Sequence, residues 1–366
     1  MRRLMTGNEA VAEGALLAGC NFYSGYPITP SSEIMHIMAA ELPKRGGNFI
    51  QAEDELAAIN IAVGASIAGA IAMTATSGPG FSLMQEGIGY AIMTEVPVVI
   101  VNVMRVGPST GQATKPAQGD LMQARWGRHG DQALVVYAPS SPQEALYITH
   151  KAFETAELLR TPVVVLTDEF IAHGREVVEY YDLKPVRRRI QEKPEPPFGS
   201  EDPTRVPPLP PLGEGFNVMF TGSTHDEWGY RDVHRQEVHF KLVKRIWDKI
   251  WMNSKSLFLY EKQGDDDAEV TFVCYGSVSR SVKGAIAVLR SKGIRAKLLR
   301  LITLWPIDWE VLEREIEGRV FVPEMSLGQL SFDVEKFAKV EKINKVGGGI
   351  PIYPSDIVKA VVEVMR

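Results

Sequence analysis

The sequence predicts an α/β protein built on two parallel sheets, a larger domain followed by a smaller one. The chain has 366 residues, enough for two or three domains that each bury a core. From residue 6 to about residue 170, short apolar runs alternate with helical stretches, the pattern of a parallel sheet with crossover helices. A second such series begins at residue 269. We therefore expect α/β domains over residues 1–180 and 256–366, connected by residues 181–255.

The expected strands of the first domain are apolar at consecutive positions, as strands covered on both faces are. The helices between them have recognisable starts. Ser31-Ser32-Glu33 opens one helix, and Ser141-Pro142-Gln143-Glu144 combines a Ser-x-x-Glu capping pattern with proline at the first helical position. The expected strands are 21–24, 49–52, 70–74, 96–104, 134–138 and 162–167.

Residues 183–216 interrupt this pattern and predict a linker rather than a domain. They contain eight prolines between Pro194 and Pro211, and the basic run Arg187-Arg188-Arg189. That run indicates a solvated linker more than an anion-binding patch. A helix is expected over 236–251, followed by the second domain. Its expected strands are 269–275, 295–302 and 319–322, with helices ending at Lys292 and beginning at Asp308 and Pro354.

Charge is sparse in the first 120 residues, which hold 6 of the 40 basic and 10 of the 45 acidic side chains. A domain so poor in charge needs another subunit to cover part of its surface, so we expect a partner interface there. The net charge of -5 argues against a nucleic-acid coat or a polybasic membrane-surface protein. The uncharged stretch 56–75 contains Asn60 and many Ala and Gly residues, which indicates a buried helix followed by a buried strand, not a membrane span.

The two cysteines, Cys20 and Cys274, are too isolated to form a disulfide framework, a zinc site or an iron–sulfur cluster on this chain alone. No metal site is expected. His225, His234 and His239 lie in a segment without a fixed ligand set, which favours a surface loop. Residues 1–9 lack the apolar core of a signal peptide, so a cytoplasmic location is expected.

Ligands of parallel sheets bind beyond the carboxyl ends of the strands, so the loops there are the candidate site. After the first strand, two prolines hold Thr29 in a turn where its hydroxyl can meet an anion or a carbonyl oxygen, with Ser31 or Ser32 as helix caps. After the second strand comes Glu53-Asp54-Glu55. Helix capping explains two of these acids. A carboxyl group that faces the apolar helix start gains proton affinity and suits proton exchange with a ligand.

The loops after the third and fourth strands leave alternatives open. Residues 76–80, Thr-Ser-Gly-Pro-Gly, indicate either a weak phosphate site or a tight structural turn. Arg105 and Lys115 are the only basic residues between Arg45 and Arg125. They predict either carboxylate or phosphate binding, or ion pairs with the acids of the second loop.

Seven segments together resemble one known family. They are GNEAVAEGALLAGC, GYPITPSSE, EDELAAINIAVGAS, TATSGPGFSL, MRVGPSTGQATKPAQGDLMQARWG, TGSTHDEWGY and PEMSLGQLSFDVEK, in this order from Thr6 onward. This set resembles the α subunit of 2-oxoacid:ferredoxin oxidoreductases, most closely the 2-oxoglutarate synthase type. The resemblance implies a pyrimidine-type thiamine-diphosphate-binding domain followed by a transketolase-C-like α/β domain.

The resemblance also implies a divided site. Thiamine diphosphate would be shared with a β subunit, with Mg²⁺ and iron–sulfur clusters on partner subunits of β, γ or δ type. The chain agrees, because it lacks a GDG-plus-Asn diphosphate motif and a cysteine cluster. The implied reaction is oxidative decarboxylation of 2-oxoglutarate to succinyl-CoA, with coenzyme A as acyl acceptor and ferredoxin as electron acceptor. Alternatives are a branched-chain or other 2-oxoacid enzyme, or a non-catalytic assembly subunit.

Residue by residue, the resemblance implies the following roles. Glu55 precedes Gly64 by nine positions, as the family's catalytic glutamate precedes a helix glycine, and it would hydrogen-bond the pyrimidine ring. Tyr26 and Pro27 would contact the cofactor. Thr29 would act near the reacting carbonyl.

Two basic residues complete the implied site. Arg105 would bind the substrate together with Thr29. Lys115 would bind the distal carboxylate of 2-oxoglutarate.

Overall fold

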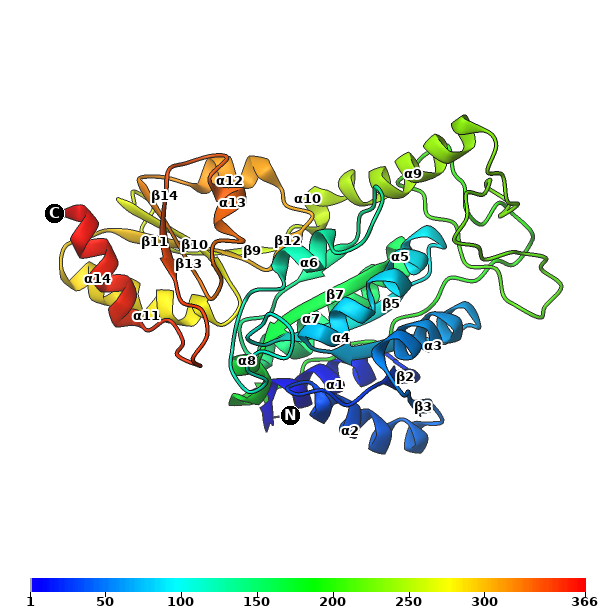
Figure 1. The fold of residues 1–366 in the computed structure, drawn as a ribbon, viewed down its shortest axis with the longest axis horizontal. Coiled ribbons are helices and arrows are strands. Elements are labelled where there is room, and N and C mark those ends of the chain that lie inside the picture. The colour runs from blue at the N-terminus through cyan, green and yellow to red at the C-terminus, as the bar shows by residue number, and fades with distance from the viewer. Residues whose placement is uncertain (1) are drawn as a thin grey trace.

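The structure, a computed structural model, describes residues 2–366 and contains three sheets (Figure 1). The largest has seven strands, of which all but the edge strand β12 run parallel to their neighbours. In spatial order they are β12 (Thr303–Trp305), β6 (Val135–Tyr137), β7 (Pro162–Asp168), β5 (Val98–Met104), β4 (Ala72–Thr76), β2 (Phe22–Gly25) and β3 (Asn48–Gln51).

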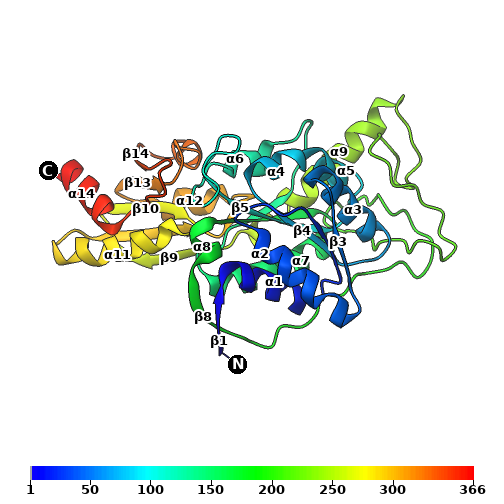
Figure 2. The same cartoon turned by 60° about the horizontal axis from the view of Figure 1, so that its bottom comes forward.

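The second sheet has five strands, and its edge strand β9 is antiparallel to β11 while the others are parallel. A two-stranded antiparallel sheet of β1 and β8 lies beside α1 at the amino terminus (Figure 2). The second sheet follows the order β14 (Val340–Asn344), β13 (Arg319–Glu324), β10 (Val270–Tyr275), β11 (Ala296–Leu301) and β9 (Tyr260–Gly264), and the small sheet pairs β1 (Arg2–Thr6) with β8 (Arg175–Glu179).

Every strand expected from the sequence is present, within a few residues at its ends. The stretch 56–75 is a helix followed by a strand, as expected. Five strands were missed, namely β1, β8, β9, β12 and β14. Two of them form the two-stranded sheet, and the other three are edge strands of the larger sheets. Such strands are less covered than central strands, so they lack a continuous apolar run.

Helices cover both faces of the seven-stranded sheet. In β5, Val99 and Val101 face α1, α2 and α7, while Val98 and Ile100 face α3, α4, α5, α6 and α9. The helix bounds are α1 (Gly7–Leu17), α2 (Ser32–Glu41), α3 (Glu55–Ile67), α4 (Gly78–Leu83), α5 (Gln85–Met93), α6 (Leu121–Trp126), α7 (Pro142–Leu159), α8 (Glu169–His173) and α9 (Gln236–Trp251).

The second domain shares a hydrophobic core with the first. One face of its sheet, with Val273 and Leu299, belongs to the same buried cluster as Leu121 of α6 and Trp305 of β12. The other face packs on α11 and α14. The remaining helices are α10 (Ser254–Leu257), α11 (Val278–Ser291), α12 (Trp309–Glu315), α13 (Ser331–Val334) and α14 (Pro354–Met365), and a 3₁₀ turn covers Pro43–Arg45. The division at residues 180 and 255 stays a prediction.

Polar contacts fix the two α/β units to each other at the carboxyl edge of the second sheet. The fully buried Gln118 donates its backbone N–H to the Met325 carbonyl (2.9 Å) and its side-chain amide to the Tyr275 carbonyl (3.0 Å). It accepts bonds from the Tyr275 hydroxyl (3.1 Å) and the Met325 N–H (3.0 Å). A buried ion pair between Arg125 of α6 and Asp333 of α13 adds a second link.

The proline-rich segment between β8 and α9 has no helix or strand among its described residues, but it is held in place. The buried Arg160 donates to the carbonyls of Pro197 and Pro207. Arg188 pairs with Glu157 at 2.6 Å, and both side chains are 6% exposed. The expectation of a solvated basic run is therefore wrong for Arg188, because its side chain is buried against α7, where Glu157 compensates its charge.

A buried charge cluster joins α9 to the end of α5. Glu95, with a side chain that is 0% exposed, accepts bonds from Arg245 and from Lys249 (2.8 Å). Arg160 also donates to the Glu95 backbone carbonyl. This cluster fixes the connecting helix to the first domain. Across residues 2–366, no helix is both long and apolar enough to cross a membrane.

Candidate active site

The candidate site lies at the carboxyl edge of the seven-stranded sheet. Because β5, β4, β2 and β3 are parallel neighbours, the loops that follow them come together at that edge. These loops cover residues 105–120, 26–31 and 52–54, and after β4 the single residue Ser77 leads into the first turn of α4, residues 78–80. The topology therefore gathers the four loops that the sequence marked as candidates.

Glu55 is a buried acid at the start of α3. Its neighbour Asp54 is the helix cap, accepting a bond from the Ala57 N–H at 2.7 Å, and Glu53 is exposed. Helix capping thus explains one of the three acids, not two. Glu55 is 4% exposed. Burial raises the pKa of Glu55, Asp54 adds to the rise, and Arg105 opposes it.

The Gly-Pro-Gly turn packs directly against Glu55. A Cβ atom at Gly80 would lie 2.2 Å from Glu55 Oε1 and 2.2 Å from Thr76 Oγ1, so only glycine permits this approach. The hydroxyl oxygens of Thr76 and Ser77 are buried without a hydrogen-bond partner among the described residues. The turn therefore serves tight packing, in agreement with the structural alternative.

Arg105 links the loop after β5 to the loop after β2. It is 6% exposed, and its Nη1 donates to the Thr29 carbonyl at 2.6 Å, while its Nε is buried without a partner among residues 2–366. Burial lowers the pKa of Arg105, although Asp120 and Glu55 oppose that shift. Neither Arg105 nor Lys115 forms an ion pair in the described chain, which excludes the alternative of pairs with the acids of the second loop.

Thr29 lies in a turn in which its side chain is exposed. Tyr26 is 39% exposed and Pro27 is half-buried in the same loop. Ser31 occupies the N-cap position of α2, as expected, but its side chain makes no capping hydrogen bond. Ser31 instead donates its hydroxyl to the Ile28 carbonyl at 2.9 Å, which closes the turn locally.

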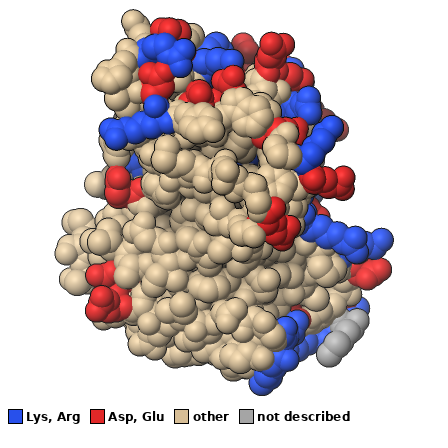
Figure 3. Space-filling model, turned by 90° about the vertical axis from the view of Figure 1, so that its right-hand side faces the viewer, with Lys and Arg blue, Asp and Glu red and all other residues tan. Residues whose placement is uncertain are grey.

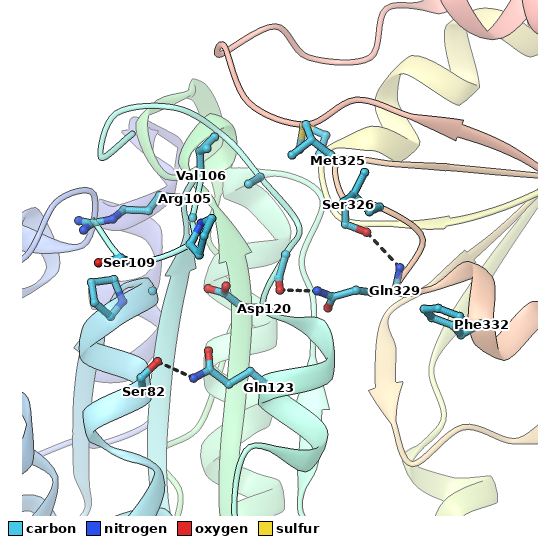
Figure 4. A pocket seen from close by; sticks show the side chains of 18 residues that line it. Ser82, Arg105, Val106, Ser109, Asp120, Gln123, Met325, Ser326, Gln329 and Phe332 are labelled. Carbon is cyan, nitrogen blue, oxygen red and sulfur yellow. Dashed lines mark hydrogen bonds between the residues drawn. The ribbon is translucent and has the colours of Figure 1, made fainter. Parts of the chain in front are cut away.

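A cavity of about 560 Å³ opens between the two α/β units beside Arg105 (Figure 4). Asp120 and Gln123 line it from the first domain, and Gln329 and Phe332 from the second. Asp120 accepts a bond from Asn102 at 2.9 Å. Burial raises the pKa of Asp120 despite this bond and the nearby Arg105.

Sequence reasoning did not single out Asp120, Asn102 or Gln118. Asn102 carried a usable signal, because it is the one polar residue in the apolar strand β5. Gln118 and Asp120 belong to the PAQGD segment quoted above.

Lys115 is not among the residues that line the cavity. Its side chain is exposed and runs along the glycine loop 347–349, where a Cβ at Gly349 would lie 2.2 Å from Lys115 Cδ. Gln112 in the same loop accepts a bond from the Gly348 N–H at 2.7 Å. The second domain therefore shapes the position of Lys115.

Of the three histidines expected in a surface loop, His234 is exposed in a bend before α9 and His239 is exposed on α9, whereas His225 is buried. His225 is 1% exposed, packs against the Phe198 ring and hydrogen-bonds the Ser223 carbonyl. Among residues 2–366, no group of three His, Cys, Asp or Glu side chains is arranged to hold a metal ion.

One side of the molecule is almost free of charge. Figure 3 shows a broad face without Lys, Arg, Asp or Glu, with charged residues gathered along its rim. On the same side in Figure 1 lies α3, which exposes Leu56, Asn60 and Gly64 at every fourth position, and the exposed Ala68 is its C-cap residue. A Cβ at Gly64 would meet nothing within 4 Å in this chain. The expected partner interface on this face stays a prediction.

The parallel sheet and the buried acid of α3 agree with the thiamine-diphosphate-binding α/β fold that the sequence resemblance implies. Residues 13–245 match the family described as pyruvate flavodoxin/ferredoxin oxidoreductase, thiamine diphosphate-binding, and residues 268–357 match pyruvate:ferredoxin oxidoreductase core domain II. The chain belongs to the pyruvate flavodoxin/ferredoxin oxidoreductase family, which confirms the resemblance seen in the sequence and the expected order of its two folds.

Named relatives resemble the chain over nearly its whole length. The 2-oxoglutarate synthase subunit KorA of Methanocaldococcus jannaschii is 49% identical over 98% of both chains. The ketoisovalerate oxidoreductase subunit VorB of Methanothermobacter thermautotrophicus is 36% identical, over 99% of this chain and 97% of that protein. The solved 2-oxoglutarate:ferredoxin oxidoreductase of Magnetococcus marinus, with 2-oxoglutarate, coenzyme A and succinyl-CoA bound, is 33% identical with a TM-score of 0.91. It covers all of this chain, which spans 65% of that longer chain.

Proposed function

We propose that this chain is the α subunit of a 2-oxoglutarate:ferredoxin oxidoreductase that oxidatively decarboxylates 2-oxoglutarate to succinyl-CoA. The observation that carries the reaction class is the buried Glu55 against Gly80, next to an Arg105 that holds the Thr29 loop. The choice of 2-oxoglutarate is supported by the higher identity to KorA than to VorB. A β subunit and further γ- or δ-type subunits would complete the enzyme, and ferredoxin would accept the electrons.

The residues present fit the pyrimidine half of thiamine diphosphate. The carboxyl group of Glu55 is buried at the carboxyl edge of the seven-stranded sheet, and the lack of a Cβ on Gly80 leaves room beside it. The hydroxyls of Thr76 and Ser77, which have no hydrogen-bond partner among the described residues, lie at the same edge. When bound, the cofactor supplies the nucleophilic carbon that attacks the 2-oxo group. Tyr26 and Pro27 would line the same cofactor site, while Mg²⁺ and the iron–sulfur clusters would be held by partner subunits.

In this proposal the chain's own residues bind and orient the substrate and exchange a proton with the cofactor. Because burial raises its pKa, Glu55 holds a proton more readily than an exposed acid, and in the protonated form its Oε–H can donate to a ring nitrogen. Thr29 presents an exposed hydroxyl to the 2-oxo carbonyl. The Arg105 guanidinium has a free Nε–H and can bind the adjacent carboxylate.

The substrate choice predicts a rate difference in the purified native complex. With coenzyme A and a viologen dye as electron acceptor, 2-oxoglutarate should be oxidised faster than 2-oxoisovalerate, because the second carboxylate contributes binding energy. Equal or reversed rates would favour the ketoisovalerate alternative that VorB represents.

Lys115 is proposed to bind the distal carboxylate of 2-oxoglutarate. Lys115→Met should raise KM for 2-oxoglutarate by about 10-fold, since one charge-assisted contact is lost. KM for 2-oxobutyrate, which has no second carboxylate, should stay unchanged. Lys359→Met, at a side chain of α14 that is 77% exposed, is the matched control and should behave as wild type. An unchanged KM for 2-oxoglutarate in Lys115→Met would remove Lys115 from the site.

A further inference from the structure

Asn8, from the GNEA segment at the start of α1, has no part in the site described so far. Its side chain is 0% exposed. Its Nδ2 donates to the Pro30 carbonyl at 2.8 Å and to Glu33 Oε2 at 2.9 Å. These contacts reach 22 and 25 residues along the chain, so they tie α1 to the loop that follows β2.

The Thr29 loop is thus held at two adjacent carbonyl groups by side chains from opposite sides. Arg105, after β5, binds the Thr29 carbonyl at 2.6 Å, and Asn8, in α1, binds the Pro30 carbonyl. The other bonds of the turn are local, from the Ser31 N–H and hydroxyl to the Ile28 carbonyl. Arg105 is expected to bind substrate as well as the loop, whereas Asn8 contacts only the protein. The bond from Asn8 therefore stays the same when substrate binds.

The unpaired oxygen of Asn8 indicates why an amide stands at this position. Its Oδ1 is buried without a hydrogen-bond partner among the described residues. Burying an unpaired acceptor costs free energy, so a position selected for packing alone would favour an apolar side chain. The two N–H groups of the amide, in contrast, are both used. The donor function of Asn8 therefore outweighs the cost of its oxygen.

We propose that Asn8 is a positioning residue that fixes the Thr29 loop relative to Arg105 and thereby sets the affinity for the 2-oxoacid. This inference rests on the proposed function, because it takes Thr29 as a substrate contact. Asn8 itself does not touch substrate in this account. It removes freedom from the loop before substrate binds, so that less ordering is needed on binding.

Two variants, made in this chain of the assembled complex, test the proposal. Asn8→Ala removes both donors and the unpaired oxygen. Asn8→Asp keeps the side-chain volume but places a carboxylate against the Pro30 carbonyl and the Glu33 carboxylate. It is therefore combined with Glu33→Gln, whose amide donates to the new carboxylate. The bond to the Pro30 carbonyl stays lost in this double variant. In both, KM for 2-oxoglutarate should rise by about 10-fold, with a smaller change in kcat.

A second measurement is independent of activity. In the complex without substrate, backbone hydrogen exchange over residues 26–33 should accelerate in both Asn8 variants, since the loop loses one of its two anchors. The matched control is Asn253→Asp, which removes a side-chain bond to the Lys249 carbonyl at the end of α9, outside the site loops. It should leave KM and loop exchange unchanged.

Thr29→Ala separates this inference from the proposed function. If Thr29→Ala raises KM while both Asn8 variants keep wild-type KM and wild-type exchange, the role of Asn8 is overturned and the site stands. If Thr29→Ala has no effect on KM, the substrate role of Thr29 fails. The exchange data then decide whether Asn8 anchors the loop, and unchanged exchange overturns the inference.

Discussion

Replacing Glu55 by Gln should lower the turnover of the assembled complex by about 100-fold or more, without loss of assembly. Gln keeps the shape that fits against Gly80, but it cannot exchange a proton with the cofactor ring. The measurement is dye reduction with 2-oxoglutarate and coenzyme A at saturating thiamine diphosphate. Glu53→Gln is the matched control, because Glu53 is an exposed acid two residues away and should leave turnover unchanged.

The stability of the Glu55→Gln variant distinguishes a functional carboxylate from a structural one. Because burial raises the pKa of Glu55, the folded chain binds this proton more tightly than the unfolded chain, whose pKa is near 4.5. That contribution to stability is present below the unfolded pKa and is lost as pH rises through the folded pKa. At pH 7 the variant should therefore unfold at the same temperature as wild type or higher. Full activity in Glu55→Gln would support the non-catalytic alternative.

The second large effect is expected at Glu95, far from the chemistry. Burial acts to raise the pKa of Glu95, but Arg245 and Lys249 outweigh it and hold that pKa well below its usual range. Burial lowers the pKa of Lys249 to about 8 despite the attraction of Glu95. Glu95→Gln removes the one carboxylate in this group of buried cations. The free energy of unfolding should fall by about 3 kcal/mol or more, measured by urea unfolding of the full chain.

An exposed ion pair provides the control for Glu95. Glu310 pairs with Lys255 at 2.7 Å, with side chains 73% and 71% exposed. Solvent screens such a pair, so Glu310→Gln should leave the urea midpoint unchanged. If Glu95→Gln unfolded at the wild-type midpoint as well, the buried cluster would not be what fixes α9 to the first domain.

The fold was predictable where burial imposes a pattern on consecutive residues. The strand β5 is apolar at six of its seven positions because helices cover both faces, and the run could be recognised without the structure. The strand β14, Val-Glu-Lys-Ile-Asn, gives no such signal. It is an edge strand whose only neighbour is β13, so few of its side chains are buried.

The candidate site was predictable to the level of loops. Strand ends, with glycine and proline in the loops, indicated Thr29, Arg105 and the acidic run 53–55, and the family resemblance selected Glu55 from that run. The hydrogen-bond partners of Ser31 and Arg105 could not be predicted, because sequence patterns do not show which carbonyl groups the fold brings within reach of a side chain. The fold gave Ser31 a carbonyl of its own turn and gave Arg105 the carbonyl of Thr29.

By itself, the sequence determined the parallel α/β architecture, the family and the acid at the start of α3, because periodicity, motif order and strand ends are properties of neighbouring residues. The tertiary structure alone decided which groups meet. Gly80 approaches Glu55, Asn8 reaches Pro30, and Gln118 joins the two sheets only because β-α crossovers bring distant loops to one edge. Such pairs cannot be predicted from the sequence, because their residues are far apart along the chain. Their contacts are stabilised by the packing of whole helices and strands and not by residues adjacent in sequence.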